Sequence, residues 1–359
     1  MILADLHTIH QITVNHTIYT RAEVCNPDWE IPVGEYYPEL FGFLKEWWSD
    51  SPTMTVQTSG STGRPKPMEV EKQRMVESAR TTCRYLRLSR GDTALLCMSL
   101  DYIAGKMMVV RALVCGLNII PTTPCGHPLK ECTERIDFAA MVPLQVVNSL
   151  SVLEEAGCFE QIKKVIIGGS SISEQLAIDL QQLSNAVYSS YGMTETLSHI
   201  ALRRINGADA SKSYFPLSQV EVSLSDEGTL VIDAPHICPV RLTTHDMAEI
   251  HADGSFDILG RKDHVINSGG LKIQIEEVER ILTPVIRGDF AVTSAPDERF
   301  GEALVLVVTN PFEESQIAKV LPTYYFPKQI LQIDSLPRLE NAKLDRLSLK
   351  RIAKENYRG

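Results

Sequence analysis

The stretch of this 359-residue chain that could most clearly do chemistry is a nine-residue run of hydroxyl, glycine and basic residues, Thr58-Ser59-Gly60-Ser61-Thr62-Gly63-Arg64-Pro65-Lys66. Its glycines let backbone N–H groups approach an anion closely, its hydroxyls add donors, and its lysine adds a mobile positive charge. The spacing excludes a Walker A loop, because Lys66 does not directly follow the second glycine. A polar surface turn is the alternative, but the density of hydroxyls and glycines favours a phosphate-binding loop.

Two further clusters follow segments that are predicted to be strands. Gly168-Gly169-Ser170 follows residues 165–167, and Tyr191-Gly192-Met193-Thr194-Glu195 follows residues 186–188. Ligands of open α/β sheets collect at the carboxyl ends of strands. An aromatic ring beside a glycine can pack against a flat base, and a carboxylate can hold a magnesium ion that bridges phosphates. Alone, the second cluster favours a strand-end turn capped by Thr194, but the phosphate loop upstream reverses that preference toward a nucleotide site.

Polar groups in the C-terminal half have both a structural and a functional interpretation. Asp246 lies either in an ordinary turn or where a carboxylate binds two ribose hydroxyls. Arg261 and Asp263 form either a charged hairpin end or a hinge whose arginine touches the nucleotide. Gly269-Gly270 is either a flexible loop or one that reaches the active site after a rotation. Lys343 lies in a basic tail, where a lone lysine is ordinarily solvated.

Composition and charge exclude several classes of protein. Hydrophobic residues make up 44% and charged residues 22%, which is ordinary for a globular protein. The formal net charge of -10 argues against broad binding to nucleic acid or to an anionic membrane. The eight cysteines are scattered without C-x-x-C pairs, which favours buried thiols in a reducing compartment over disulfides or a zinc site. No signal peptide or membrane-spanning stretch is evident, so we expect a cytoplasmic protein without membrane insertion.

The periodicity predicts an α/β protein of two domains. Up to residue 190, short apolar runs alternate with helical periods, which is typical of βαβ units and a largely parallel sheet. The predicted strands there are 54–57, 93–98, 117–120, 139–142, 165–167 and 186–188, and the predicted helices are 71–87, 104–115, 143–155 and 173–183. Antiparallel hairpins are predicted from strands 220–224, 229–232, 248–251 and 256–259. A small α+β domain should follow, with helices 275–282 and 313–321 and strands 289–294, 303–308 and 330–333. The predicted domains are 1–260 and 261–359.

In this order, the clusters resemble the motifs of the adenylate-forming superfamily of acyl-CoA synthetases, luciferases and peptide-synthetase adenylation domains. The matching stretches are T-S-G-S-T-G-x-P-K, Y-G-x-T-E, the aspartate before the last hairpin, G-R-x-D, the G-G loop and the lysine of the tail, and they cover residues 58–346. The resemblance implies a large N-terminal α/β domain with mixed sheets and a β-rich subdomain, followed by a small mobile C-terminal domain. It also implies ATP, Mg²⁺ and CoA as cofactors and co-substrates, and a small carboxylic acid as substrate.

The resemblance assigns roles to individual residues. Its ATP-binding set is Thr58, Ser59, Gly60, Ser61, Thr62, Gly63, Lys66, Gly168, Gly169, Ser170, Tyr191, Gly192, Asp246 and Arg261. Its catalytic set is Lys66, Thr194, Glu195 and Lys343, in which Thr194 would contact the α-phosphate, Glu195 would coordinate magnesium and Lys343 would bridge the substrate carboxylate and the α-phosphate. Asp263 would be the hinge, and Gly269 and Gly270 would form the loop on the CoA side.

The chain departs from the superfamily pattern at four points. His245 and Ala342 stand where glycines are usual, and Thr229 replaces the usual glutamate. Only 57 residues precede the phosphate loop, whereas relatives usually have well over a hundred. We therefore expect a trimmed N-terminal region and a compact enzyme for a small substrate.

The acid is predicted from residues 100–105 and the helix that follows. Tyr102 lies where the superfamily commonly has a histidine facing the acyl pocket, and Lys106 and Arg111 follow it. Arg111 is either at the helix's solvent edge or, like Lys106, in a pocket where it pairs with a second substrate carboxylate. The short build and this stretch look most like the ligases that join o-succinylbenzoate to CoA in menaquinone synthesis. The alternatives are another aryl- or short-acyl-CoA ligase, an enzyme that adenylates for a carrier protein, and a non-catalytic nucleotide-binding homologue.

Overall fold

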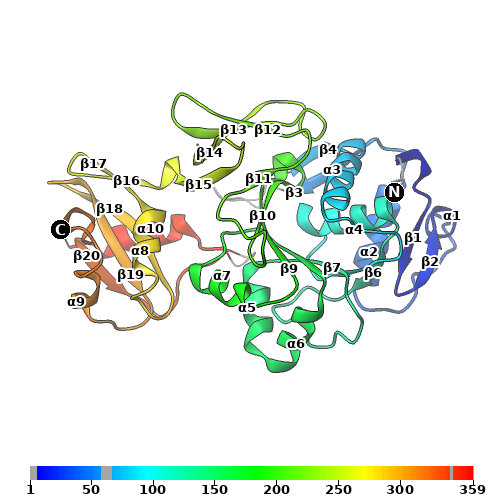
Figure 1. Ribbon diagram of the computed structural model, residues 1–359, viewed down its shortest axis with the longest axis horizontal. Coiled ribbons are helices and arrows are strands. Elements are labelled where there is room, and N and C mark those ends of the chain that lie inside the picture. Colours follow the sequence, from blue (N-terminus) through cyan, green and yellow to red (C-terminus); the bar gives the residue numbers. More distant parts are fainter. Residues whose placement is uncertain (1–5, 58–66, 340–342, 359) are drawn as a thin grey trace. The chain divides into compact units, whose positions relative to one another are not determined.

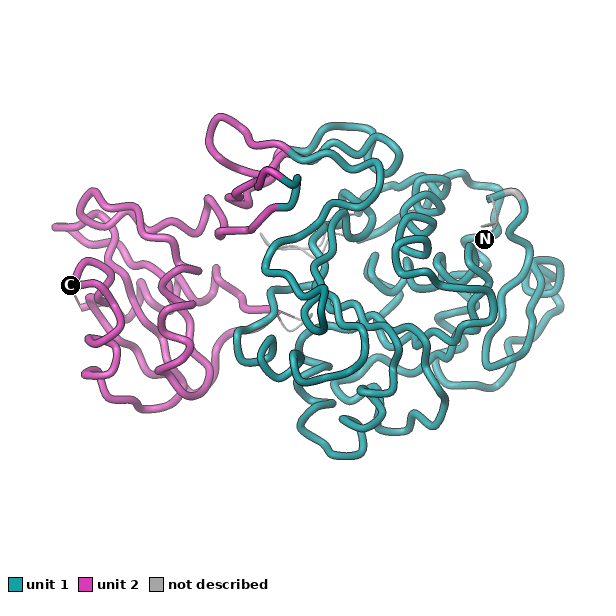
Figure 2. Tube along the Cα trace, in the orientation of Figure 1, with its two compact units in different colours: residues 1–222, 232–242, 253–255 teal, residues 223–231, 243–252, 256–359 magenta. Residues whose placement is uncertain are grey.

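The computed structural model describes residues 6–57, 67–339 and 343–358. The chain divides into two compact units, coloured separately in Figure 2. The first comprises residues 1–222, 232–242 and 253–255, and the second comprises residues 223–231, 243–252 and 256–359. Most of the hairpin residues therefore group with the C-terminal residues, whereas the sequence predicted a boundary after residue 260. The position of a hinge stays a prediction.

A nine-stranded sheet forms the centre of the first unit, in the order β11-β10-β9-β8-β7-β5-β6-β1-β2 (Figure 1). Its strands are β1 (Gln11–Val14), β2 (Thr17–Thr20), β5 (Thr93–Leu96), β6 (Asn118–Pro121), β7 (Phe138–Met141), β8 (Lys164–Ile167), β9 (Ala186–Gly192), β10 (His199–Arg204) and β11 (Phe215–Pro216). The run from β1 through β6, β5, β7 and β8 to β9 is parallel, and β2, β10 and β11 add antiparallel edges. The predicted α/β class and largely parallel sheet are confirmed.

Helices cover both faces of this sheet. They are α1 (Arg21–Val24), α2 (Tyr37–Trp47), α3 (Lys72–Tyr85), α4 (Ile103–Cys115), α5 (Pro143–Ser151), α6 (Leu153–Gln161) and α7 (Glu174–Gln181). Side chains of α5, α6 and α7 share one apolar cluster with Val187 of β9. The next residue, Tyr188, contacts Tyr85 of α3 instead, and neighbouring residues of a strand point to opposite faces. Helix α3 therefore lies on the face opposite to α5–α7 (Figure 1).

The predicted phosphate loop joins two antiparallel strands. β3 (Thr53–Gln57) and β4 (Pro67–Glu71) pair over their whole length, with Gln57 opposite Pro67. The predicted helix 71–87 is confirmed by α3, whereas β4, between the loop and that helix, was not predicted. Alternating residues of β3 are buried while its other residues stay exposed, so the pair forms a half-buried hairpin. Residues 58–66, which carry the loop itself, lie outside the described residues.

The second unit contains most residues of one sheet and all of another. One is the meander of β12 (Glu221–Leu224), β13 (Thr229–Asp233), β14 (Leu242–Ile250) and β15 (Phe256–Arg261), which confirms the predicted hairpins. The other has the order β17-β16-β19-β18, with β20 beside β19, and consists of β16 (Val265–Ser268), β17 (Leu271–Gln274), β18 (Phe290–Asp297), β19 (Gly301–Val308) and β20 (Gln329–Gln332). Its helices are α8 (Ile275–Leu282), α9 (Glu314–Ile317) and α10 (Arg346–Asn356).

Both faces of the β17-β16-β19-β18 sheet are buried, as consecutive residues of β19 show. Leu304 and Leu306 belong to the apolar cluster that contains Val278 of α8, whereas Val305 and Val307 belong to the cluster of α10. A strand buried on both faces reads as a continuous apolar run, because each face needs its own apolar residues. This sandwich of helices around a sheet confirms the predicted α+β pattern.

Element boundaries differ from the predictions mainly where a short helix was expected. Residues 143–155 form two helices, because Val152 is extended between α5 and α6. The predicted helix 313–321 is helical only over α9. All eight cysteines are free thiols, but the predicted burial holds for only four of them, and Cys25 and Cys125 are exposed. No helix within the described ranges is long and apolar enough to cross a bilayer.

Helix α6 offers a test of the core of the first unit. Phe159 is fully buried in the cluster beneath α5–α7, whereas Leu153, on the same helix, is 86% exposed. Phe159→Ala should lower the free energy of unfolding by about 3–5 kcal/mol, because it removes apolar contacts and leaves a cavity. Leu153→Ala, the matched control, should change it by about 0.5 kcal/mol or less. Scanning calorimetry measures both, and equal effects would contradict this account of the core.

Candidate active site

The predicted adenine-side residues of the first unit lie together at the carboxyl edge of β8 and β9. Gly168 directly follows β8, and its backbone N–H donates to the carbonyl of Met141 at 3.0 Å. A Cβ on Gly168 would lie 2.4 Å from the Ser190 hydroxyl of β9, so a side chain here would force that hydroxyl away from the Ile167 carbonyl to which it donates. Gly169 has φ +88°, a conformation that favours glycine. The chain thus presents bare backbone at this edge, as close approach by a ligand requires.

The segment from Gly192 to His199 reverses the chain between β9 and β10. Gly192 pairs with His199, and a Cβ there would lie 2.3 Å from the carbonyl oxygen of Ser198. The Thr196 hydroxyl holds the reversal from within, because it lies 3.0 Å from the N–H of Met193 and 2.7 Å from the carbonyl of Ser198. Only glycine at 192 permits so close a return of the backbone.

Thr194 and Glu195 begin the short 3₁₀ helix of this turn, Thr194–Thr196. Thr194 is buried, whereas Glu195 is exposed. The described residues contain no group of three or more histidine, cysteine or acidic side chains that could cage a metal. An exposed single carboxylate fits magnesium, which is usually held by one or two carboxylates together with phosphates and water.

Arg111 of α4 lies beneath this turn, so its interpretation as a solvent-edge arginine was wrong. It is only 3% exposed, and its Nη2 donates to the Ser198 hydroxyl at 2.5 Å. Burial lowers the pKa of Arg111 to about 10, so the group stays charged near neutral pH. Burial and the charge of Arg111 together hold the pKa of the adjacent His199 well below its ordinary value. The sequence prediction missed Ser198 and His199, although they follow the Y-G-x-T-E motif within the same turn.

The other two predicted acyl-pocket residues lie near the amino end of α4. Tyr102 forms an isolated parallel bridge with Gln57, the last residue of β3. The Lys106 ammonium lies 5.6 Å from the centre of the Phe43 ring. It also lines a cavity of about 470 Å³, whose other walls include the carboxylates Glu39, Glu46 and Asp101. Among the described residues that line this cavity, Lys106 is the one cation.

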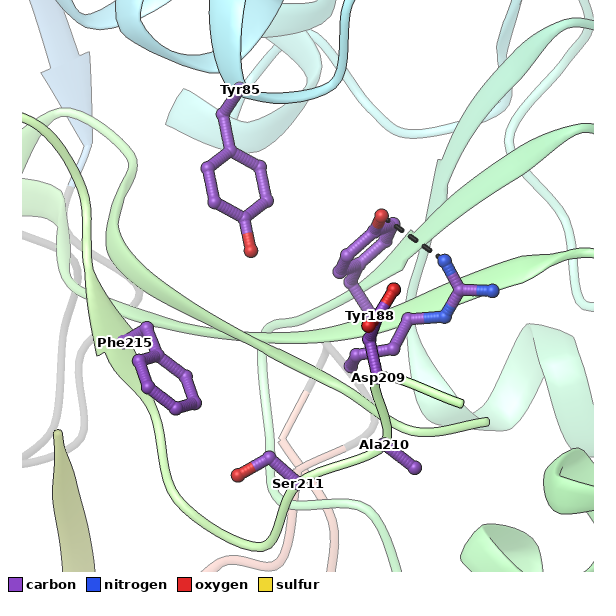
Figure 3. Close-up of a pocket in the computed structure, with 7 residues that line it drawn as sticks. Tyr85, Tyr188, Asp209, Ala210, Ser211 and Phe215 are labelled. Atoms are coloured by element: carbon purple, nitrogen blue, oxygen red, sulfur yellow. Dashed lines mark hydrogen bonds between the residues drawn. The ribbon is translucent and has the colours of Figure 1, made fainter. Parts of the chain in front are cut away.

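A second cavity, of about 510 Å³, is lined by none of the predicted residues (Figure 3). Tyr85 and Phe215 form two of its walls, and Tyr188 forms a third with its hydroxyl accepting from Arg204 at 3.1 Å. The Arg204 Nε donates to the carbonyl oxygen of Asn206 at 2.9 Å. Its Nη2 donates to the carbonyl of Asn185 at 3.4 Å, so each nitrogen of the Arg204 guanidinium has a partner within the fold.

In the second unit, Asp246 and Arg261 stand directly opposite each other on β14 and β15. The Arg261 guanidinium makes two hydrogen bonds to Asp263, at 2.9 and 3.0 Å, and lies 3.5 Å from Asp246. The hydrogen bonds that Arg261 donates to Asp263 raise the pKa of Arg261. Burial alone would raise the pKa of Asp263, but Arg261 outweighs it and lowers that pKa. The ribose and hinge candidates are therefore one connected cluster of charges.

The predicted glycine loop is a two-residue hairpin turn. Gly269 and Gly270 join β16 to β17 with φ of +58° and +83°, as a type I′ turn requires. The N–H of Gly269 donates to the carbonyl of Phe300 at 2.8 Å. Both strands of this hairpin belong to the sheet of the second unit, so the turn is held at its base.

Lys343 follows the undescribed residues 340–342, which include Ala342. Its carbonyl accepts from the N–H of Leu339 at 2.8 Å. Burial lowers the pKa of its ammonium below the ordinary value. Lys343 is therefore partly desolvated. A lone lysine in a basic tail would ordinarily be solvated. The phosphate-loop residues, Thr58 to Lys66, also lie outside the described residues.

Comparisons with known proteins agree with this arrangement. The family of AMP-binding enzymes matches residues 10–236. A 2-succinylbenzoate–CoA ligase of Listeria monocytogenes is 25% identical over 341 residues, which cover 86% of this chain and 72% of that protein. A solved acyl-CoA synthetase (AMP-forming)/AMP-acid ligase II-like protein of Dyadobacter fermentans is 33% identical with a TM-score of 0.63, covering 89% of this chain and 95% of that one.

The o-succinylbenzoate CoA synthetase of Bacillus subtilis, solved with its acyl-adenylate intermediate, shares the fold. Its TM-score is 0.69 at 22% identity, with 82% of this chain and 68% of that chain covered. The same enzyme has also been solved with ATP and a magnesium ion. The predicted adenylate-forming fold is thereby confirmed. Because the family match spans well over half of the sequence, this chain belongs to the family of AMP-binding enzymes.

Proposed function

We propose that this chain is an AMP-forming acid–CoA ligase and that its acid is o-succinylbenzoate. The observation that carries the proposal is the meeting of bare backbone at Gly168 with the turn of Thr194 and Glu195 at one edge of a parallel sheet. Such an edge is where α/β folds bind nucleotides. Family membership and relatives named 2-succinylbenzoate–CoA ligase support the same conclusion.

In the first half-reaction, a carboxylate oxygen of the acid attacks the α-phosphorus of ATP. The bond from the α-phosphorus to the bridging oxygen breaks, and pyrophosphate leaves with the electron pair. Thr194 and Lys343 are proposed to hydrogen-bond the α-phosphate, and Lys343 also orients the carboxylate. Magnesium, when bound at Glu195, would neutralise phosphate charge. Asp246 is proposed to accept from the ribose hydroxyls beside Arg261.

In the second half-reaction, the CoA thiolate attacks the acyl carbonyl carbon. The bond from that carbon to the phosphate oxygen breaks, and AMP leaves as the thioester forms. We propose that the part of the second unit that follows Asp263 turns about this residue between the two steps, which withdraws Lys343 and brings in the Gly269–Gly270 hairpin. The hydrogen bonds between Arg261 and Asp263 would then form in the arrangement for one half-reaction and break in the arrangement for the other.

The second carboxylate of o-succinylbenzoate needs a cation of its own. Lys106 stands at the wall of a cavity large enough for a small aryl acid, whereas the Arg111 guanidinium is covered by protein. We therefore assign recognition of the free carboxylate to Lys106, with Tyr102 near the same helix end. Arg111, the other candidate, contacts the turn through Ser198 instead.

The acid can be tested directly. With ATP and CoA, o-succinylbenzoate should release pyrophosphate and form a thioester with a kcat/KM roughly tenfold or more above that of benzoate, since one charged hydrogen bond contributes about 1.5–3 kcal/mol. Coupled pyrophosphate release and chromatography of the acyl-CoA measure this. Turnover of benzoate but not of o-succinylbenzoate would assign the chain to another aryl-CoA ligase. Adenylation without any acyl-CoA would instead indicate a carrier protein as acceptor.

The role of Gly168 can be separated from its packing. Gly168→Ala should lower the melting temperature, because its Cβ would force the Ser190 hydroxyl out of its hydrogen bond to Ile167, whereas Gly168→Ala with Ser190→Ala removes that close contact. If Gly168 lies against adenine, the double variant should match Ser190→Ala in melting temperature and yet show a KM for ATP raised about tenfold or more. Full recovery of the KM in the double variant would limit Gly168 to a packing role.

Lys343 should act in only one half-reaction. Lys343→Ala is expected to lower acyl-adenylate formation by about 10²–10³, the typical effect of removing one donor to a developing charge, and to spare thioester formation from preformed acyl-adenylate. Lys350→Ala, which removes an exposed lysine of α10, is the matched control. Single-turnover assays of each half-reaction measure the two rates. An unchanged adenylation rate would remove Lys343 from its proposed role.

A further inference from the structure

A buried charge without a carboxylate partner lies under the β9–β10 turn. The Arg111 guanidinium has no acidic group within ion-pair distance in the described part of the chain, and its Nε has no hydrogen-bond partner there. Its Nη1 has only the weak acceptor Met108 Sδ, at 3.6 Å. Burying an unpaired charge costs several kcal/mol, so a fold keeps one where another advantage offsets that cost.

The Arg111 side chain begins a chain of hydrogen bonds whose direction is fixed at both ends. Its Nη2 can only donate, and it donates to Ser198 Oγ. The Ser198 hydroxyl lies 3.3 Å from His199 Nδ1, and His199 Nε2 lies 3.0 Å from Thr82 Oγ1. The chain ends at the carbonyl of Ser78, which can only accept and receives the Thr82 hydroxyl at 3.2 Å.

Because the Arg111 guanidinium can only donate and the Ser78 carbonyl can only accept, the position of every hydrogen between them is determined. Because Thr82 gives its proton to a carbonyl, it must accept from His199, so the Nε2 of His199 carries the hydrogen. His199 Nδ1 is then an acceptor, and the Ser198 hydroxyl donates to it. This arrangement requires a neutral imidazole, in agreement with the low pKa of His199. Arg111 is the charged group that faces His199, and the thiol of Cys83 lies beside Arg111.

These hydrogen bonds join three elements of the first unit. Arg111 belongs to α4, Thr82 belongs to α3, and Ser198 and His199 close the turn that carries Thr194 and Glu195. Leu197, next to Ser198, has φ +62°, a strained conformation for a leucine that its surroundings must hold in place. The turn thus has a strained backbone and a buried polar anchor at adjacent residues.

We propose that Arg111, Ser198, His199 and Thr82 are positioning residues that hold the Thr194–Glu195 turn in the conformation needed for acyl-adenylate formation. This inference rests on the proposed function. The four side chains act on the turn, and none of them touches the reacting atoms. Their loss should therefore slow adenylation while leaving the affinity for CoA in the second half-reaction unchanged.

Thr82 and Thr81 provide a matched pair of substitutions. Both hydroxyls donate to the carbonyl four residues earlier in α3, but only Thr82 receives His199. Thr82→Val keeps the side-chain shape and should lower the kcat of adenylation roughly tenfold, as expected from leaving a buried donor unpaired. Thr81→Val should leave it unchanged, and Thr82→Ser, which keeps the hydroxyl, should recover most of the activity. Ser198→Ala should lower the kcat as Thr82→Val does.

A second measurement does not depend on activity. Nitrogen-15 NMR of histidine-labelled protein, with His199 assigned by its loss in His199→Gln, should show a neutral Nε2–H imidazole between about pH 6 and pH 8. In Thr82→Val the signal should shift toward the Nδ1–H tautomer, since Nε2 loses its acceptor. An Nδ1–H tautomer in the unaltered protein, or equal kcat values for the two valine variants, would overturn the positioning role. Absence of adenylation with every acid would overturn the proposed function, and the tautomer would still decide the hydrogen-bond chain.

Discussion

The parallel pairing of six strands is the constraint on which the rest of the first unit depends. Because β1, β6, β5, β7, β8 and β9 run in one direction, their carboxyl ends share one edge of the sheet. That edge brings Gly168 against Ser190, and the Thr194–Thr196 turn follows β9 at the same edge. After β9 the backbone reverses direction into β10. The reversal is tight, because Gly192 pairs directly with His199.

Two buried cations in the first unit, Lys72 and Arg111, differ in how many hydrogen-bond acceptors surround their charged groups. Lys72 caps the end of α2, with its ammonium 3.0 and 3.1 Å from the carbonyls of Glu46 and Ser49. Every donor has a partner, so the lysine contributes to stability and needs no other explanation. Arg111 lacks such a set of acceptors. Its guanidinium donates instead to the Ser198 hydroxyl of the β9–β10 turn. The unsatisfied arginine is therefore the better indicator of function.

The second unit combines rigid and adjustable parts. Its α8 and α10 clusters bury both faces of one sheet, so that sheet should move as a body. The charges of Asp246, Arg261 and Asp263 are instead only partly buried and form hydrogen-bonded ion pairs. Such pairs contribute little net stability, because water competes for both partners. A segment that has to rearrange between two reactions is consistent with bonds of this kind.

The sequence by itself determined the α/β class, most strands of both sheets and the candidate residues of the nucleotide edge, because apolar periodicity and glycine-rich turns are local signals. It could not predict that β4 precedes α3, because strand pairing with β3 is a contact between separate segments. Nor could it predict the surroundings of Arg111, for an arginine on an apolar helix fits a solvent edge as well as a pocket. Tertiary structure decided that question: packing of α3, α4 and the β9–β10 turn removed water from the guanidinium and left Ser198 as its partner.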